Sequence, residues 1–186
     1  ADFGEDLDKG GVKGLEESTK QDAKKKKEEG FDKKLNGLLK KLPATAKVAV
    51  LEPKTKALEF ETPEPDPEEE SVRTKIIKHI ESMREKAKDL LEERLGELDI
   101  IVLDRDIFKD IEKEIVYSQT GEVDPSSGAE FGKKLGATHM IVAKLIYEGF
   151  KTAHPTVTFS IKIIEVESAK RIGTINFTQE IDIEQL

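Results

Sequence analysis

The sequence predicts a domain of the α/β (α+β) class, a mixed sheet with helices packed on it, in the order β-α-β-α-α-β-β-β. In the first part of the chain, short apolar runs alternate with segments whose apolar residues recur at helical spacing. The last third instead alternates apolar and polar residues with a period of two. Helices that cross over between the early strands make those strands parallel, whereas closely spaced late strands form an antiparallel meander.

Composition limits the classes of protein that this chain can represent. It has 186 residues and a mass of 20.8 kDa, with 36% hydrophobic and 38% charged residues. Ordinary globular chains have about 45–50% apolar and about 25% charged residues, so we expect part of this chain to be solvated. The absence of Cys excludes disulfides and thiolate metal sites. A net charge of −8 and a pI near 5.1 argue against nucleic-acid binding.

The distribution of charge and apolar residues predicts three parts of the chain. Residues 1–30 form a flexible charged tail that is poor in apolar residues. Residues 31–46 form an amphipathic helix that docks on the domain, the alternative being a membrane surface. Residues 47–186 form the single folded domain. Within it, residues 59–70 hold seven acids, three prolines and no base, and predict an extended solvated connector, or a docking site for a cation or partner.

The predicted elements of the first half follow in order. Val48–Leu51, ended by Pro53, is a strand buried on both faces. An apolar stripe from Ile76 to Leu95 predicts a long helix, capped by Ser71 and stopped by Gly96. The four residues 100–103 are a second buried strand.

Two further helices are predicted before the meander. Asp104 or Asp106 caps the first, whose apolar residues are Ile107, Phe108, Ile111, Ile115 and Val116. After a loop over Gly121–Gly128, residues 129–135 form a short helix closed by Gly136, and Gly132 allows it to pack closely on the sheet. Strands over His139–Tyr147, Thr156–Val166 and Ile172–Ile183 then pair through hairpins at Gly149–Pro155 and Glu167–Arg171.

The sequence predicts no enzyme, no cofactor and no metal site. The three histidines, His79, His139 and His154, fall on a helix, a strand start and a hairpin, without the i, i+4 spacing of a helical metal site. No serine has the G-x-S-x-G elbow of a nucleophile. We therefore expect no catalytic residue, and structural or surface roles for the histidines.

The candidate ligand-binding residues are Asp104, Arg105 and Asp106. They follow the second predicted strand directly. Ligands of open α/β sheets bind at the carboxyl ends of strands, which favours a site here. An Asp at a helix start also has a plain capping role, which we regard as the stronger interpretation.

The stretch VLDRDIFKDIEKEIVYSQTGEVDPSSGAEFGKKLGATHMIVAKL, residues 102–145, resembles the curli-secretion CsgG family. In that family a strand ends in an acid–Arg pair, here Asp104-Arg105, and an apolar helix and a Ser-to-Gly loop follow, here Ser118 to Gly121. A short helix then leads to a Leu-Gly-Ala motif and a β-branched strand, here from Leu135. KVAVLEP from Lys47 and SIKIIEVESAKRIGTINFTQEI from Ser160 resemble the opening strand and the last hairpin of the family.

The resemblance implies the soluble periplasmic branch of the family, which includes the penicillin-binding-protein activator LpoB. The curli channel builds its barrel from insertions, and the first insertion point here holds only the seven residues Gly149–Pro155. A membrane hairpin needs two strands of about 9–11 residues each, so this chain is not expected to form that pore.

The implied protein is a non-enzymatic, lipoprotein-type domain that binds a protein partner of the cell envelope. It is periplasmic and tethered to the outer membrane through an N-terminal anchor that is absent from this chain. Two alternatives stay open. One is a self-associating ring module of a secretion or assembly apparatus, and the other is a small-ligand-binding α/β domain.

Overall fold

The computed structural model describes residues 21–22, 25–26, 29–55, 67–114, 123–149 and 154–186. The chain divides into two compact units, Ala1–Gly37 and Leu38–Leu186. In the first unit, residues 29–37 are helical. Several predicted features lie wholly or partly outside the described residues: the tail over 1–30, the connector over 59–70, helix residues Ile115 and Val116, the loop over Gly121–Gly128 and the hairpin over Gly149–Pro155.

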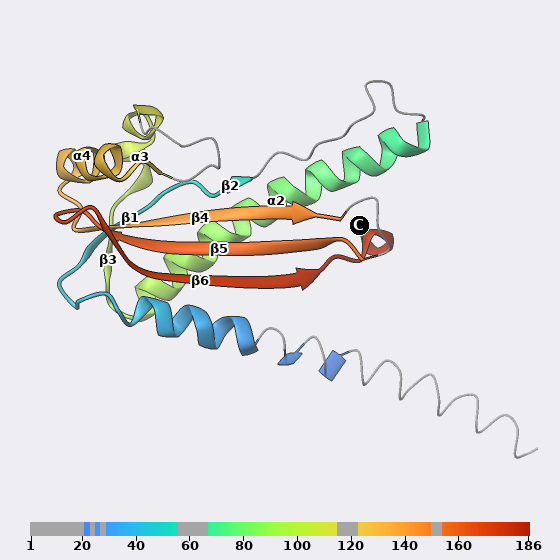
Figure 1. Cartoon of the computed structure of the whole chain (residues 1–186), viewed down its shortest axis with the longest axis horizontal. Helices are drawn as coiled ribbons and strands as arrows, with labels where there is room; N and C mark the ends of the chain where they lie inside the picture. The colour runs from blue at the N-terminus through green and yellow to red at the C-terminus, as the bar shows by residue number, and fades with distance from the viewer. Residues whose placement is uncertain (1–20, 23–24, 27–28, 56–66, 115–122, 150–153) are drawn as a thin grey trace, which may run out of the picture. The chain divides into compact units, whose positions relative to one another are not determined.

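The second unit is built on a six-stranded mixed sheet with the order β3-β1-β4-β5-β6, and β2 pairs with β4 beyond the end of β1 (Figure 1). The strands are β1 (Lys47–Val50), β2 (Lys54–Thr55), β3 (Ile101–Val102), β4 (His139–Glu148), β5 (Thr156–Glu165) and β6 (Lys170–Glu180). The pairs of β1 with β3 and β4 are parallel, and those of β4 with β5 and β5 with β6 are antiparallel. The predicted fold class is confirmed.

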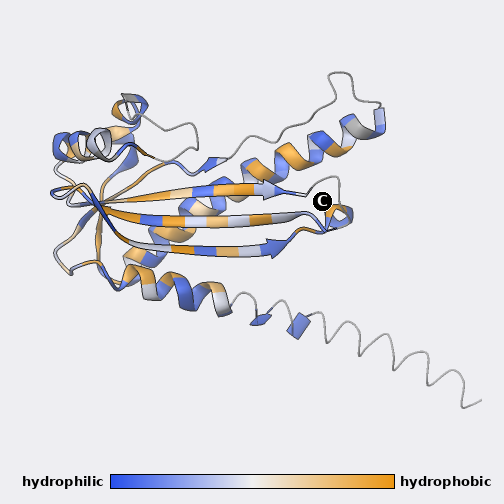
Figure 2. Ribbon diagram, viewed as in Figure 1, coloured by the Kyte–Doolittle hydropathy of each residue, from blue (hydrophilic) through white to orange (hydrophobic). Residues whose placement is uncertain are grey.

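Helix α2 (Pro67–Glu97) packs on one face of the sheet. Its residues Ile76 and Ile80 contact Leu145 and Tyr147 of β4 in a buried cluster. Strand side chains alternate between faces, so the odd-numbered residues of β4 face α2. Figure 2 shows the matching alternation of hydrophobic and hydrophilic residues along this helix.

Three short helices cover one end of the opposite face. They are α3 (Arg105–Phe108), η1 (Ile111–Glu114) and α4 (Pro125–Leu135). Phe108 and Phe131 meet edge to face with ring centroids 5.9 Å apart, and they pack in one cluster with Met140 and Val142 of β4. Gly132 of α4 lies against Val166, and because glycine has no side chain the helix can approach the sheet closely. A Cβ at Gly132 would lie 2.8 Å from Val166 Cγ1.

The prediction that Ser71 caps the long helix was wrong, because α2 begins at Pro67. Proline suits the first turn of a helix, where its missing N–H has no intrahelical partner. The acidic residues Glu68 and Glu70 then lie in that first turn, where carboxylates favour the positive end of the helix dipole. The prediction of an extended connector over residues 59–70 was therefore wrong for residues 67–70, which are helical, and residues 59–66 lie outside the described part of the chain.

The predicted stop at Gly96 was also displaced, since α2 continues through Glu97. The left-handed residue that follows the helix is Asp99, with φ 55°. Short polar Asp tolerates this conformation better than most non-glycine residues. By contrast, Gly136 closes α4 as predicted, with φ 70°.

The prediction that residues 100–103 form a buried strand was only partly right. Ile100 is 8% exposed, but Ile101 is 55% exposed and only Ile101–Val102 form the strand β3. The reason is the sheet order, in which β3 is an edge strand that pairs with β1 alone. An apolar run in the sequence does not distinguish a central strand from an edge strand.

The helix predicted after Asp104 is interrupted. It consists of the four-residue α3 and the separate 3-10 turn η1. The next helix, in turn, is longer than predicted, because α4 begins at Pro125 with Asp124 as its N-cap. Strand β2 was not predicted at all. Strand β1 ends at Val50, and the chain resumes pairing directly after Pro53, with Lys54 opposite Lys144.

Candidate functional site

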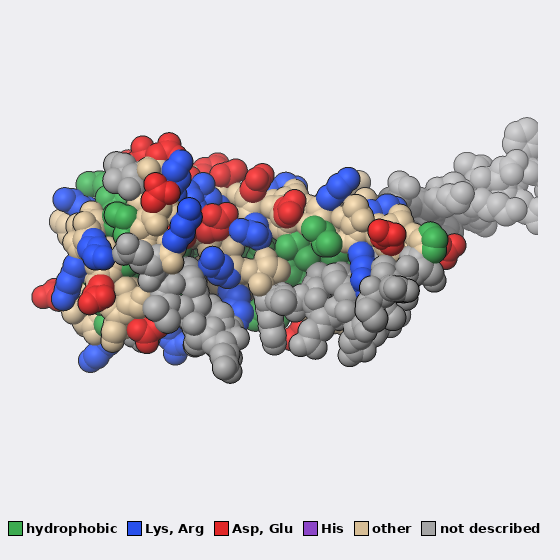
Figure 3. All heavy atoms as spheres, turned by 90° about the horizontal axis from the view of Figure 1, so that it is seen from above, with side chains coloured by type: hydrophobic (Ala, Val, Ile, Leu, Met, Phe, Trp, Pro, Cys, Tyr) green, Lys and Arg blue, Asp and Glu red, His purple; other side chains and the backbone are tan. Residues whose placement is uncertain are grey.

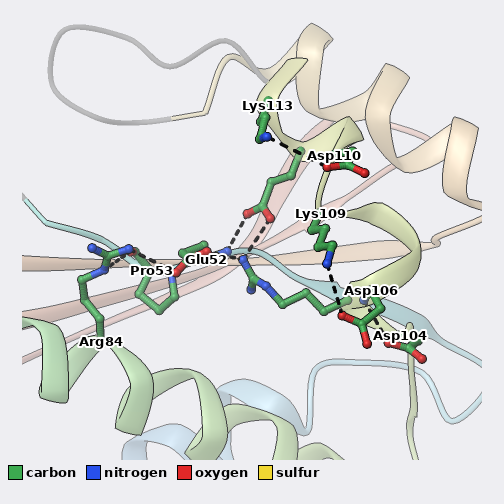
Figure 4. Close-up of polar contacts among 10 residues, drawn as sticks. Glu52, Pro53, Arg84, Asp104, Asp106, Lys109, Asp110 and Lys113 are labelled. Carbon is green, nitrogen blue, oxygen red and sulfur yellow. Dashed lines mark hydrogen bonds and ion pairs between the residues drawn. The ribbon is translucent and has the colours of Figure 1, made fainter.

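The carboxyl ends of β1 and β3 bring together four charged side chains, Glu52, Arg84, Arg105 and Glu112, which we call the Glu–Arg cluster (Figure 4). Glu52 follows β1 and Arg105 opens α3, while Arg84 and Glu112 come from α2 and η1. These are the parallel-strand ends at which the sequence predicts a site. The cluster contains one of the three predicted residues, Arg105.

The geometry of the Glu–Arg cluster joins every member to another. Arg105 Nη2 lies 2.5 Å from Glu52 Oε2 and 3.0 Å from Glu112 Oε2. The second oxygen of Glu112 accepts the backbone N–H of Glu52 at 2.7 Å. Arg84 donates to Glu52 Oε1 at 3.1 Å and to the carbonyl of Pro53 at 3.1 Å.

The Glu–Arg cluster is electrically balanced and partly buried. Its two guanidinium groups meet two carboxylates, and the Glu112 side chain is 9% exposed. A buried carboxylate is stable only when paired and hydrogen-bonded, as this one is. Since each carboxylate is occupied by a neighbouring donor, the arrangement fits a tie between β1, α2, α3 and η1 better than a proton-transferring site.

Asp104 and Asp106 point away from the Glu–Arg cluster, as their labelled positions in Figure 4 show. Asp104 accepts the backbone N–H of Asp106 at 3.0 Å and caps α3, which confirms the capping interpretation for Asp104. Asp106 is exposed and lies 3.8 Å from Lys109. The idea that Asp104, Arg105 and Asp106 together bind a ligand stays a prediction.

Sequence reasoning missed Glu52, Arg84 and Glu112. Glu52 carries a usable signal, because an acid directly after a buried parallel strand occupies the ligand-binding edge of such a sheet. Glu112 gives none, since acids are frequent on every helix of this chain. Arg84 lies 32 residues from Glu52 along the chain, so its pairing depends on the tertiary fold.

His139 lies at a second polar location, beside a shallow cavity of about 330 Å³. This cavity is lined by Lys133, Thr138, His139, Glu165 and Glu167 together with Ala137 and Val166. The Thr138 hydroxyl lies 2.8 Å from His139 Nδ1. Burial lowers the pKa of His139, and the nearby Glu165 carboxylate opposes part of this shift.

The other histidines occupy separate places. His79 lies on α2, where burial, and secondarily the charge of Lys86, lowers its pKa. His154 Nδ1 lies 2.6 Å from Glu180 Oε1 on the surface. Within the described part of the chain, no three His, Asp or Glu side chains gather as metal ligands. Among the same residues, no helix is long and apolar enough to cross a membrane.

A regular polar surface lies on the sheet itself. Beyond Met140 and Val142, the even-numbered side chains of β4 continue along the face that carries α3 and α4 and pair with polar residues of β5 and β6. We call this surface the open polar face; Ser160 in its first row is buried, and its exposed members lie further along the strands. Its cross-strand rows are Lys144/Ser160/Asn176, Ile146/Thr158/Thr178 and Glu148/Thr156/Glu180.

The open polar face is rich in hydroxyl groups. Thr158 and Thr178 lie opposite one another with their hydroxyl oxygens 2.8 Å apart. The side chains of Glu148, Asn176, Thr178 and Glu180 are exposed. Elsewhere, on the side seen in Figure 3, the described Lys, Arg, Asp and Glu side chains are intermixed.

No family model matches this chain, and no curated protein matches it in sequence. Solved structures do resemble it. The LpoB C-terminal domain from Salmonella enterica is 9% identical, with a TM-score of 0.49 over 81% of this chain and 98% of that one. The lipoprotein GNA1162 from Neisseria meningitidis is 12% identical, with a TM-score of 0.45 over 73% of this chain and 81% of that one.

A third similar structure is the PelC dodecamer from Paraburkholderia phytofirmans. It is 14% identical, with a TM-score of 0.34 over 77% of this chain and 80% of that one.

Proposed function

We propose that this chain is a non-enzymatic protein-binding domain of the bacterial cell envelope. It acts in the periplasm, tethered to the outer membrane through an N-terminal anchor, and it docks on a protein partner there. The observation that carries the proposal is the open polar face of β4, β5 and β6. The resemblance of residues 102–145 to the CsgG family, in its soluble branch, supports the compartment.

The shape and chemistry of the open polar face favour a protein as the ligand. Hydroxyl and amide groups at Thr158, Asn176 and Thr178 both donate and accept hydrogen bonds. They stand on paired strands, which hold them more rigidly than loops would. A protein–protein interface of standard size contains several spaced hydrogen bonds, which such an array can supply. A small molecule instead needs a concave site.

The Glu–Arg cluster supports a binding role over a catalytic one. Its carboxylates are engaged by Arg105, Arg84 and a backbone N–H, and none stands next to a nucleophile in the described contacts. Docking is then the whole mechanism, with the sheet as the recognition surface.

Site-specific photo-cross-linking tests the binding role in cells. A photoreactive residue replaces Thr178 on the open polar face or, as a matched control, the exposed Glu85 on α2. We expect one discrete envelope-protein adduct from position 178 and none from position 85. A Thr158→Arg substitution, which places a bulky charge in the same row, should abolish that adduct. Equal labelling from both positions would refute the assigned face.

Fractionation of the source cells tests the compartment. We expect the native protein in the membrane fraction, with an intact mass that includes a lipid attached upstream of Ala1. An unmodified chain recovered from the cytosol would overturn the envelope assignment. That result would favour the small-ligand alternative. A screen for ligands that raise the unfolding temperature would then test it, with the Asp104→Ala variant as the control that should lose the effect.

A further inference from the structure

Four basic side chains gather at the end of the sheet where strand β6 begins. Lys41 lies against Gly173 of this strand, because a Cβ added to the glycine would lie 3.1 Å from Lys41 Cδ and 3.4 Å from Lys41 Nζ. The first two residues of β6 are also basic. We call this group the basic rim, and its members, all of them exposed, are Lys40, Lys41, Lys170 and Arg171.

A bulge in β6 places Lys170 on the same face of the sheet as Lys41. Ile172 has no partner in β5, where the register shifts, so the residues before it change faces relative to an unbroken strand. Lys170 consequently points to the same side as Gly173, against which Lys41 lies. The bulge thus adds the charge of Lys170 to that of Lys41.

The basic rim keeps a net positive charge beside its acidic neighbours on β5 and in the turn before β6. Glu165 lies opposite Lys170 and is half-buried, and Glu167 in the turn is exposed. Among the described residues, no member of the rim takes part in an ion pair. Its four charges are therefore available to an anionic surface.

The other end of the sheet is acidic. No Lys or Arg occurs from Ile172 to Leu186. The 11 residues of β6, at about 3.3 Å each, separate the two ends by roughly 35 Å (Figure 1). This separation is several times the Debye length of about 8 Å, so each end meets a charged surface independently. The exposed acids at and beyond the ends of β4 and β6 are Glu148, Glu180, Asp182 and Glu184.

We propose that the basic rim rests on the anionic phospholipid headgroups of the membrane to which the domain is tethered, an inference that rests on the proposed function. Residues 33–51, between the N-terminal segment and the end of β1, contain five Lys and no Asp or Glu. The chain enters the second unit at Leu38, which lies against Gly173 beside the rim. The tether thus reaches the domain at its basic end.

The charge distribution selects one orientation on the membrane. A chain with a net charge of −8 is repelled by an anionic surface as a whole, so attraction requires the basic rim to face the lipid and the acidic end to point away. The strands then run away from the membrane. Thr178 and Glu180 of the open polar face lie at the far end, where a protein partner can reach them.

Sedimentation with vesicles tests the contact. We expect the full chain to bind vesicles of equal parts phosphatidylglycerol and phosphatidylethanolamine but not vesicles of phosphatidylcholine, and to dissociate as salt is added. Lys41→Glu combined with Lys170→Glu should weaken binding at least tenfold, since each basic residue near an anionic surface contributes about fivefold. The matched control is Lys75→Glu with Lys78→Glu on α2, which changes the net charge equally at exposed positions. Equal losses in the two variants would show that net charge alone governs binding, and would refute the basic rim.

Energy transfer to a labelled lipid tests the orientation, because the chain has no native Cys and a donor dye can be attached at one introduced position. Ser168→Cys places the dye in the turn before β6, and Gln185→Cys places it beyond the end of that strand; both positions are exposed. We expect stronger transfer from position 168. Equal or stronger transfer from position 185 would overturn the orientation.

The same variants separate a lipid from an acidic protein as the ligand of the basic rim. If Lys41→Glu with Lys170→Glu abolishes the cross-linked adduct from position 178 but leaves vesicle binding intact, the rim binds a protein and the membrane contact is refuted. Failure of the full chain to bind anionic vesicles would also refute it, and leaves the cross-linking and fractionation tests of the proposed function unaffected.

Discussion

The guanidinium of Arg105 lies 3.0 Å from the carboxylate of Glu112, although the two residues belong to different helices, α3 and η1. The same carboxylate accepts the backbone N–H of Glu52, at the end of β1. One buried side chain thus fixes a strand end and an interrupted helix relative to each other. Four predictions follow from this and the other contacts described above.

Glu112→Ala should lower the free energy of unfolding by about 1.5–3 kcal/mol, the usual contribution of hydrogen bonds to a charged group. The substitution removes one partner of Arg105 and leaves the N–H of Glu52 unpaired. Urea unfolding measures the change. The matched control is Asp110→Asn, because the Asp110 carboxylate is 84% exposed in its pair with Lys113, and such pairs contribute little. Equal losses in the two variants would contradict the role of the Glu–Arg cluster.

Asp104→Ala should destabilise the protein by about 0.5–2 kcal/mol, as expected for a lost N-cap. Its carboxylate accepts the N–H of Asp106, and alanine cannot. Asp106→Ala, two residues further along and exposed, serves as the control and should have little effect. Thermal unfolding of both variants distinguishes the roles, and a larger loss at Asp106 would show that the cap is misassigned.

Gly132→Ala should destabilise the protein by about 1–3 kcal/mol through overpacking. The added methyl group would meet both Val166 methyl groups, one of them at 2.8 Å. Gly96→Ala on α2 gives the opposite expectation, a gain of about 0.5–1 kcal/mol, because nothing lies within 4 Å of its Cβ. Combining Gly132→Ala with Val166→Ala should recover part of the loss if the contact is its cause.

Stability should fall as the pH is lowered through the titration of the histidines. Burial lowers the pKa of both His79 and His139 below the ordinary value of 6.5. Between the lowered pKa values and 6.5, the unfolded chain therefore binds more protons than the folded one, and protonation favours unfolding. Stability is fully present above about pH 6.5 and declines below it.

Urea unfolding at pH 7.5, 6.5 and 5.5 measures this decline, and His139→Gln should make it shallower. His154→Gln is the control, since His154 is exposed at the surface. An unchanged slope in the His139 variant would show that its burial does not govern the effect.

The local elements of the fold were predictable because their causes are local. The alternation of apolar and polar residues identified the antiparallel meander. Gly136 ends α4 and Asp104 caps α3, as the chemistry of each residue favours. The start of α2 was misplaced because both Ser71 and Pro67 fit helix starts. Only packing against the sheet decides between them, and the sequence does not record it.

The Glu–Arg cluster was out of reach of sequence reasoning for a different reason. Glu52 and Glu112 lie 60 residues apart, and their contact depends on which strands are neighbours. The sequence predicts parallel early strands but not that β1 lies between β3 and β4. Without that strand order, the sequence could assign Arg105 to the end of a strand, but it could not identify Glu52 and Glu112 as its partners.

The position of β4 in the sheet has a consequence for the order in which the protein acquires its structure. This strand pairs with β1, β2 and β5, yet it begins only at His139. A ribosome therefore releases α2 and β1 long before their main partner exists, and β3 offers β1 only two residues. The sheet can close only near the end of synthesis, so the long-range strand pairing that completes the fold must wait for the last quarter of the chain.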